Sequence, residues 1–309
     1  MIDKLEYLIA LARERHFGRA AEACGITQPT LSAGIKQLED VLGVLLVQRG
    51  SRFVGLTPEG ERTLEWARRI VADTRAMRQD IDALKRGLSG PIRIAAIPSA
   101  LPMLAALTTP FRTRYPDVRF TVLSRNSGEI LTDLENLTID AGITYLDNEP
   151  LGRVTSVPLY RERFCLVTTA ATLPAQGETV SWAQVARLPL ALLTPDMQNR
   201  RIIDGLIASA GGGDAPTFES NSMIALLAHV RTGHWASVMP ATLANSLGEM
   251  PGLRTIPITE PDISYSIGLV APHREPASPA SSALIAEARR LSPILQNEIS
   301  PHYVSTAAQ

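Results

Sequence analysis

The hydrophobic period of the chain changes near residue 90, and this change constrains the fold more than any other feature. Up to residue 88, apolar residues recur three and four positions apart, which is the spacing of amphipathic helices. From Ile92 onward, short apolar runs alternate with helical patterns, the order of a parallel sheet covered by helices. Gly87, Ser89, Gly90 and Pro91 lie at the change and favour the end of a helix. The sequence therefore predicts a helical first part and an α/β second part.

Composition indicates a folded chain of more than one domain. A chain of 309 residues with 45% hydrophobic and 20% charged residues is too apolar to be mainly disordered. It is also longer than the ~250–300 residues at which single cores stop growing. The formal net charge of −1 indicates neither a nucleic acid nor a membrane surface as partner. Residues 1–90 hold 14 Lys and Arg against 12 Asp and Glu, so any nucleic-acid site must be local.

Cysteine usage favours a reducing compartment. Cys24 and Cys165 are the two cysteines of the chain, and each lies in an apolar stretch. The first residues carry acids where a signal peptide carries positive charge, and no run of ~18 apolar residues occurs. We therefore expect a soluble cytoplasmic protein with no membrane partner.

Three short helices are predicted before residue 43. The first has one apolar stripe, formed by Leu5, Leu8, Ile9 and Ala12. The second runs from Phe17 to Cys24 and ends at Gly25, because glycine suits the left-handed residue after a helix. The third begins with Thr27 as its cap and Pro29 in its first turn. Its inward residues are expected to be Leu31, Ile35, Leu38 and Leu42.

The outward face of the third helix distinguishes a DNA-binding helix-turn-helix from an ordinary three-helix core. Its residues are short or carry amides, namely Gln28, Thr30, Ser32, Ala33 and Lys36. Such side chains approach base edges without a bulky apolar obstacle, whereas a merely solvated helix usually carries more Glu and Lys. Residues 44–57 then predict two short strands around a Gly-Ser turn. We interpret this hairpin as a wing whose Arg49 and Arg52 grip phosphates.

One long helix is predicted from Pro58 to Leu88, with Thr57 as its cap. A seven-residue apolar repeat runs along it through Ala67, Ile70, Thr74, Met77, Ile81, Leu84 and Leu88. Such a repeat favours a partner helix, and the same helix of a second copy of this chain is the natural one. The alternative is packing against its own domain.

The remaining chain predicts two α/β lobes joined by two crossings. In the first lobe, strands are expected at 92–97, 118–123 and 139–143, and helices end near Arg112 and Asn136. The second lobe, about 161–266, has expected strands at 164–168 and 190–193 and helices at 199–210 and 222–232. A strand at 264–271 returns to the first lobe, about 91–160 and 267–296, before a last helix at 281–291. A ligand crevice is expected beyond the carboxyl ends of the strands.

The chain resembles the LysR-type transcriptional regulators over nearly its whole length. The resemblance is carried by Phe17, Ala20, Ala21, Thr27, Gln28, Pro29, Thr30, Leu31, Ser32, Ile35, Leu38, Glu39, Leu42, Gly43, Leu45, Arg49, Leu56, Thr57, Pro58, Glu59 and Gly60. It implies a winged helix-turn-helix over 1–58, a dimerising linker helix over 59–90 and a periplasmic-binding-protein-like effector domain over 91–309. It also implies an activator that binds double-stranded DNA as a homodimer or homotetramer, meets RNA polymerase and needs no metal or cofactor.

The resemblance also assigns residues. The DNA-binding positions are Thr27, Gln28, Pro29, Thr30, Ser32, Lys36, Arg49 and Arg52. Ala33 and Gly34 stand where many relatives carry longer polar residues, so readout is expected to depend more on the other positions and on DNA shape. The effector-binding positions are Ser99, Ala100, Ser127, Thr144, Gln198 and Asn199. Free N–H groups of the helices that start there favour an anionic effector, although the serines and threonines would also serve as plain helix caps.

The sequence is less consistent with an enzyme or with a solute-binding protein. An enzyme needs a nucleophile with a base, or a metal cluster, and the five histidines show no metal-ligand spacing. The chain also has no phosphate-binding loop and no Gly-x-Ser-x-Gly motif. A solute-binding protein would not explain residues 1–58. The peroxide-sensing branch of the family uses a reactive cysteine pair in the second lobe, and Cys165 alone does not supply one.

Overall fold

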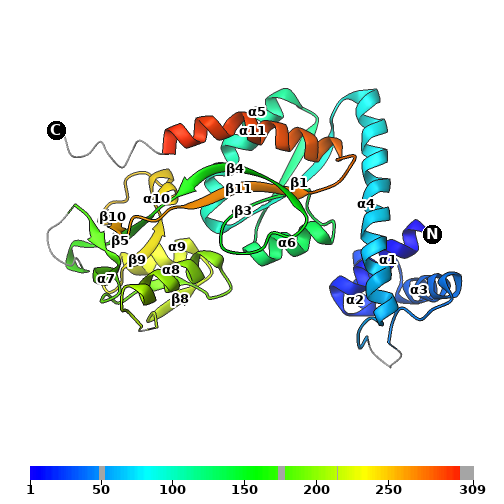
Figure 1. Cartoon of the computed structure of the whole chain (residues 1–309), viewed down its shortest axis with the longest axis horizontal. Coiled ribbons are helices and arrows are strands. Elements are labelled where there is room, and N and C mark those ends of the chain that lie inside the picture. The colour runs from blue at the N-terminus through cyan, green and yellow to red at the C-terminus, as the bar shows by residue number, and fades with distance from the viewer. Residues whose placement is uncertain (49–52, 173–177, 214, 300–309) are drawn as a thin grey trace. The chain divides into compact units, whose positions relative to one another are not determined.

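The computed structural model describes residues 1–48, 53–172, 178–213 and 215–299, which form two compact units (Figure 1). The first unit comprises Met1–Leu88 with the short segments Asp133–Thr138 and Arg274–Pro279. The second unit holds the other described residues.

Four helices build the first unit, and the last three begin at a residue whose side chain caps the helix. They are α1 (Ile2–Glu14), α2 (Phe17–Ala23), α3 (Gln28–Leu42) and α4 (Pro58–Arg86). Thr27 and Thr57 cap α3 and α4 as predicted, and Gly25 adopts a φ of +67°. His16 caps α2, because its Nδ1 accepts hydrogen bonds from the amides of Gly18 and Arg19. The imidazole thus performs a capping role that the sequence reading missed.

Two expectations for α3 are wrong. Leu42 is 44% exposed, because the helix ends there at Gly43 and the core stops one turn earlier. Gly34 does not lie on the exposed face of α3. It is buried against α1, and a Cβ added to it would lie 2.6 Å from Cδ2 of Tyr7. The glycine is therefore explained by the close approach of α1 and α3 rather than by the length of a DNA-reading side chain.

The described part of the predicted wing contains less strand than expected. This part pairs through a single antiparallel bridge between Val47 and Leu56. A carboxylate holds it to the recognition helix, since Glu39 Oε1 accepts the amides of Leu46 at 2.8 Å and Val47 at 3.2 Å. The Glu39 carboxylate thus accepts backbone amides that a longer strand pair would have bonded. Arg49 and Arg52 lie outside the described residues.

The apolar repeat of α4 divides into two halves. Near its start, Ala67 is fully buried in the core of the first unit, together with Leu64 and Val71. Farther along, the repeat turns outward, and Met77, Ile81 and Leu84 are 56%, 46% and 83% exposed. Packing on its own domain therefore explains Ala67, whereas Ile70 is already 38% exposed and the second half presents an apolar stripe to solvent.

The first lobe of the second unit is a five-stranded sheet with the order β2-β1-β3-β11-β4. Its strands are β1 (Gly90–Ala96), β2 (Val118–Ser124), β3 (Ala141–Tyr145), β4 (Val154–Glu162) and β11 (Tyr265–Pro272). Its helices are η1 (Pro98–Met103), α5 (Leu104–Arg114), α6 (Ser127–Glu135) and α11 (Pro279–Ile299). The first three strands are parallel, as predicted, whereas β11 pairs antiparallel with both β3 and β4. In Figure 1, α5 and α11 cover one face of this sheet and α6 the other.

The second lobe combines strands and helices, as predicted, and its strands form two sheets. It contains a four-stranded sheet of order β6-β10-β5-β9 and a separate parallel pair, β7 and β8. Its strands are β5 (Phe164–Thr168), β6 (Val180–Ser181), β7 (Ala191–Leu193), β8 (Phe218–Ser220), β9 (Ser237–Pro240) and β10 (Arg254–Glu260). Its helices are η2 (Ala170–Thr172), α7 (Trp182–Val185), α8 (Gln198–Ser209), α9 (Met223–Val230) and α10 (Ala241–Ser246). Because β5 runs antiparallel to β9 and β10, short-range alternation alone did not give its topology.

Two long strands connect the lobes. β4 leads from the first lobe into the second, and β11 returns beside it over eight paired positions. The two crossings that the sequence predicted are therefore present, and they bring the ends of β1, β2 and β3 opposite the start of α8. That arrangement forms the crevice described below.

Candidate functional site

The outward face of α3 collects the predicted base-reading side chains. Gln28, Pro29, Thr30, Ser32 and Lys36 are all exposed. The cap orders the first turn, because Thr27 Oγ1 accepts the amide of Thr30 at 3.4 Å and the two hydroxyls lie 2.9 Å apart. Residues 28–36 carry one lysine and no acid, so the face offers donors and one positive charge to a nucleic acid.

The second unit contains a narrow crevice between its two lobes. Its lining comes from the ends of three strands of the first lobe and from the start of α8 in the second. The lining residues are Ile97, Pro98, Ser99, Asn126, Ser127, Tyr145, Leu193, Met197, Gln198 and Asn199. The crevice is nearly closed and leaves room for roughly one water molecule.

Four of the six predicted effector positions line this crevice, namely Ser99, Ser127, Gln198 and Asn199. Ala100 is fully buried behind it. Thr144 is also fully buried, and its Oγ1 donates to Ser127 Oγ at 2.9 Å. Thr144 therefore positions a lining residue and does not line the crevice itself.

Hydrogen bonds cross the crevice from one lobe to the other. Asn199 Nδ2 donates to the Tyr145 hydroxyl at 3.0 Å, and Gln198 Nε2 donates to the carbonyl oxygen of Asp147 at 3.1 Å. Nearer the surface, Asn126 Nδ2 donates to Asp196 Oδ2 at 3.2 Å. Hydrogen bonds from Thr194 and then Asn126 hold the pKa of Asp196 below its ordinary value. The closed crevice is thus held by neutral polar side chains and one carboxylate.

A buried carboxyl group lies behind the crevice, and the sequence reading missed it. Glu162, the last residue of β4, is fully buried and accepts a short hydrogen bond from the Tyr145 hydroxyl. Burial raises its pKa from 4.5 to about 7, against the opposing effect of Tyr145 and Ser99. Burial also raises the pKa of Tyr145 well above its ordinary value, and the Glu162 charge adds to that rise. In the sequence Glu162 lies between Arg161 and Arg163, so no local pattern marked it as buried.

The nearby arginines of α8 are engaged elsewhere. Arg200 is buried and pairs with Asp204 at 2.7 Å and Glu219 at 2.6 Å. Arg201 pairs with Glu149 at 2.6 Å. Among the described residues that line the crevice, none is Lys, Arg or His.

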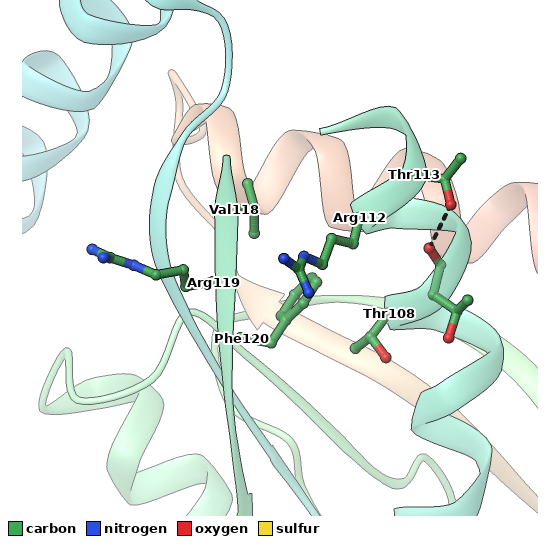
Figure 2. Close-up of a pocket in the computed structure, with 7 residues that line it drawn as sticks. Thr108, Arg112, Thr113, Val118, Arg119 and Phe120 are labelled. Carbon is green, nitrogen blue, oxygen red and sulfur yellow. Dashed lines mark hydrogen bonds between the residues drawn. The ribbon is translucent and has the colours of Figure 1, made fainter. Parts of the chain in front are cut away.

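A second hollow lies on the first lobe between α5 and β2 (Figure 2). Figure 2 shows the Arg112 side chain beside Phe120, whereas Arg119 points away. Thr113 Oγ1 donates to the Thr109 carbonyl oxygen at 3.1 Å. Most side chains here are exposed, so this open hollow lacks the buried, converging polar groups of the crevice. The crevice is therefore the stronger candidate for an effector site.

Neither cysteine has the environment of a reactive thiol. Cys165 is fully buried, and burial together with the Glu162 charge raises its pKa to about 12. Burial also raises the pKa of Cys24, and Glu6 adds to that rise. The two cysteines belong to different compact units. In the described ranges, no group of His, Cys, Asp and Glu is placed to hold a metal ion.

Both the N-terminal and the C-terminal part of the chain are similar to known proteins. Residues 2–61 match the model of the bacterial regulatory helix-turn-helix proteins of the lysR family, and residues 85–292 match the LysR substrate binding domain. The Escherichia coli DNA-binding transcriptional dual regulator OxyR is 31% identical, with 94% of each chain covered. A Haemophilus influenzae hydrogen peroxide-inducible genes activator is 29% identical, covering 87% of this chain and 89% of the relative. A full-length OxyR variant from Pseudomonas aeruginosa superposes with a TM-score of 0.70, 26% identity and 94% coverage of each chain.

A helix-turn-helix followed by a two-lobed ligand-binding unit defines a DNA-binding transcription regulator rather than an enzyme. The chain belongs to the LysR family of transcriptional regulators. Among the helices that the structure describes, none is long and apolar enough to cross a membrane.

Proposed function

We propose that this protein is an activator of transcription that responds to a small molecule bound in the crevice. The observation that carries the proposal is the nearly closed crevice, in which Ser99, Ser127, Gln198 and Asn199 converge from both lobes. The exposed face of α3 reads DNA from Gln28 onward, and the activated protein contacts RNA polymerase in the cytoplasm.

Assembly is proposed to use the outer half of α4. The exposed stripe of Met77, Ile81 and Leu84 is placed to pack against the same stripe of a second copy. Two such dimers would form a tetramer. Effector binding changes the closure of the lobes, and the assembly converts this change into a different spacing or bending of the DNA half-sites. A coupling free energy of about 1–3 kcal/mol suffices for a strong response.

The response is proposed to be reversible binding rather than thiol oxidation. Relatives of this chain are named for induction by hydrogen peroxide. This chain has two cysteines in total, Cys24 and Cys165, and the raised pKa of each disfavours the thiolate that oxidation requires. For the charge of the effector, amides at the helix starts favour an anion, as expected from the sequence, and the buried Glu162 opposes one.

Replacing Gln28 with alanine should weaken specific DNA binding by about 1–3 kcal/mol, because a bidentate amide contact to a base edge is lost. Binding to random DNA should change little. Competition gel shifts with specific and random duplexes measure both affinities, and gel filtration checks that assembly is unchanged. Equal loss on both duplexes would contradict base readout.

Arg52→Ala provides the contrasting variant. An arginine that contacts phosphate contributes to all sequences alike, so its loss should weaken both duplexes equally and reduce the dependence of affinity on salt. A change in sequence preference would contradict this assignment.

Replacing Ser99 with alanine should reduce the effector response at least tenfold, since Ser99 is a buried residue whose hydroxyl lines the crevice. DNA affinity without effector should stay as in the wild type. Reporter transcription across effector concentrations gives the measurement. An unchanged half-maximal concentration would remove Ser99 from the effector site.

A further inference from the structure

We propose that the crevice of this chain selects a small hydrogen-bond donor, an amide or a protonated amine, over a carboxylate or an inorganic anion. Asn199 Oδ1 accepts a hydrogen bond from the ligand directly. Ser99 accepts another, and the negative charge of Glu162 lies behind Ser99. The inference rests on the proposed function in one respect, namely that the effector binds in this crevice.

The hydrogen-bond chain through Tyr145 has a fixed direction. Tyr145 has one hydroxyl proton and donates it to Glu162. Asn199 must therefore present its Nδ2 to the hydroxyl, as the structure has it. The other end of the amide, Oδ1, is then an acceptor. It is buried and has no hydrogen-bond partner in the described part of the chain.

Two further polar atoms belong to the same group of side chains, and a hydrogen bond from Ser99 lowers the pKa of Glu162. They are Ser99 Oγ and Glu162 Oε2, and both are buried. A buried acceptor without a donor is costly, so a ligand that brings N–H groups relieves this cost. A ligand that brings only oxygen acceptors leaves Asn199 Oδ1 without a donor.

The charges around the crevice act in the same direction. An anion would meet the Glu162 carboxyl without a lysine, arginine or histidine in the lining. The first turn of α6, where an anion would otherwise find amides, is already occupied. Glu129 accepts the amide of Asn126 at 2.9 Å, and Asn126 accepts the amide of Glu129 at 2.8 Å. A cation or a neutral amide faces none of these obstacles.

The test compares three probes of similar size on the full chain, namely acetamide, methylammonium and acetate. Affinities are measured by saturation-transfer NMR at pH 8, where Glu162 is ionised. We expect acetamide and methylammonium to bind at least tenfold more tightly than acetate. Glu162→Gln should lower the affinity for methylammonium at least tenfold and leave that for acetate equal or higher. Glu287→Gln removes a buried carboxyl that is ion-paired with Arg290, outside the crevice lining, and should leave all three affinities unchanged.

The proposal would be overturned if acetate bound as tightly as methylammonium. It would also be overturned if either donor probe failed to bind at concentrations up to 100-fold above that of acetate. A Glu162→Gln variant with unchanged selectivity would overturn the role of the carboxyl. Failure of the proposed function would be distinguishable. In that case the probes would still bind with the expected selectivity, but no bound probe would alter DNA binding.

Discussion

Alanine at Gly60 is expected to unfold or grossly weaken the DNA-binding unit. A Cβ at this position would lie 2.0 Å from the carbonyl oxygen of Leu46 and 2.9 Å from its carbonyl carbon. That oxygen also accepts the amide of Thr57 at 2.9 Å, and the next amides of the wing are held by Glu39. Backbone must therefore move. Overpacking of this kind typically costs about 1–3 kcal/mol, and we expect the upper end or more, despite the gain in helix propensity of about 1 kcal/mol.

Calorimetry of the full chain, together with DNA affinity, measures the effect of Gly60→Ala. Gly205→Ala is the matched control, because Gly205 lies inside α8, is exposed and has open space where a Cβ would sit. That variant should be stabilised by about 1 kcal/mol. If Gly60→Ala has the same unfolding temperature and the same DNA affinity as the wild type, then α4 does not pack against the wing as described.

Replacing Glu162 with glutamine should change how stability depends on pH. The carboxyl has a pKa of about 7 when folded, against an ordinary value of 4.5. The folded state therefore binds the proton more tightly, so the wild type loses stability as pH rises from 4.5 through 7. The loss amounts to about 3 kcal/mol above pH 7. Glutamine cannot ionise, and the variant should escape this loss.

Urea unfolding at pH 5 and pH 8 measures the free energies of both proteins. The advantage of Glu162→Gln over the wild type should grow by about 2.5 kcal/mol between these conditions, because part of the loss has already occurred at pH 5. Glu287→Gln should instead be less stable than the wild type, because it breaks the ion pair with Arg290. A pH-independent difference between wild type and Glu162→Gln would show that Glu162 titrates alike in the folded and unfolded chain.

The sequence predicted those elements whose signals are local. Thr27 and Thr57 were found as caps, because a cap and its helix are adjacent in the chain. The apolar runs gave the ends of β2 and β5 to within one residue and those of β1 and β3 to within two. The sequence analysis did not predict β4, β6, β8, β9 and β10. Strand direction in the second lobe was also missed, because β5 pairs with β9 and β10, more than 60 residues farther along the chain.

The candidate site was predicted in part for the same reason. Ser99, Ser127, Gln198 and Asn199 follow strands or begin helices, which local patterns reveal. Glu162 ends a strand that was not predicted, and its importance depends on Tyr145 and Ser99, which reach it only in the folded chain. Gly34 was misinterpreted for a related reason. Its role was inferred from its neighbours in the sequence of α3, whereas in the folded chain it is determined by the contact with Tyr7.

The central claim is that this regulator binds DNA through α3 in a way that a crevice ligand alters. A footprint of the purified protein on the DNA upstream of its own gene, across a panel of small amides, amines and carboxylates, tests it most directly. The account predicts protection of a dyad-symmetric site that shortens or shifts with one compound. No protection at low salt, where even nonspecific binding of a DNA-binding protein is strong, would contradict it.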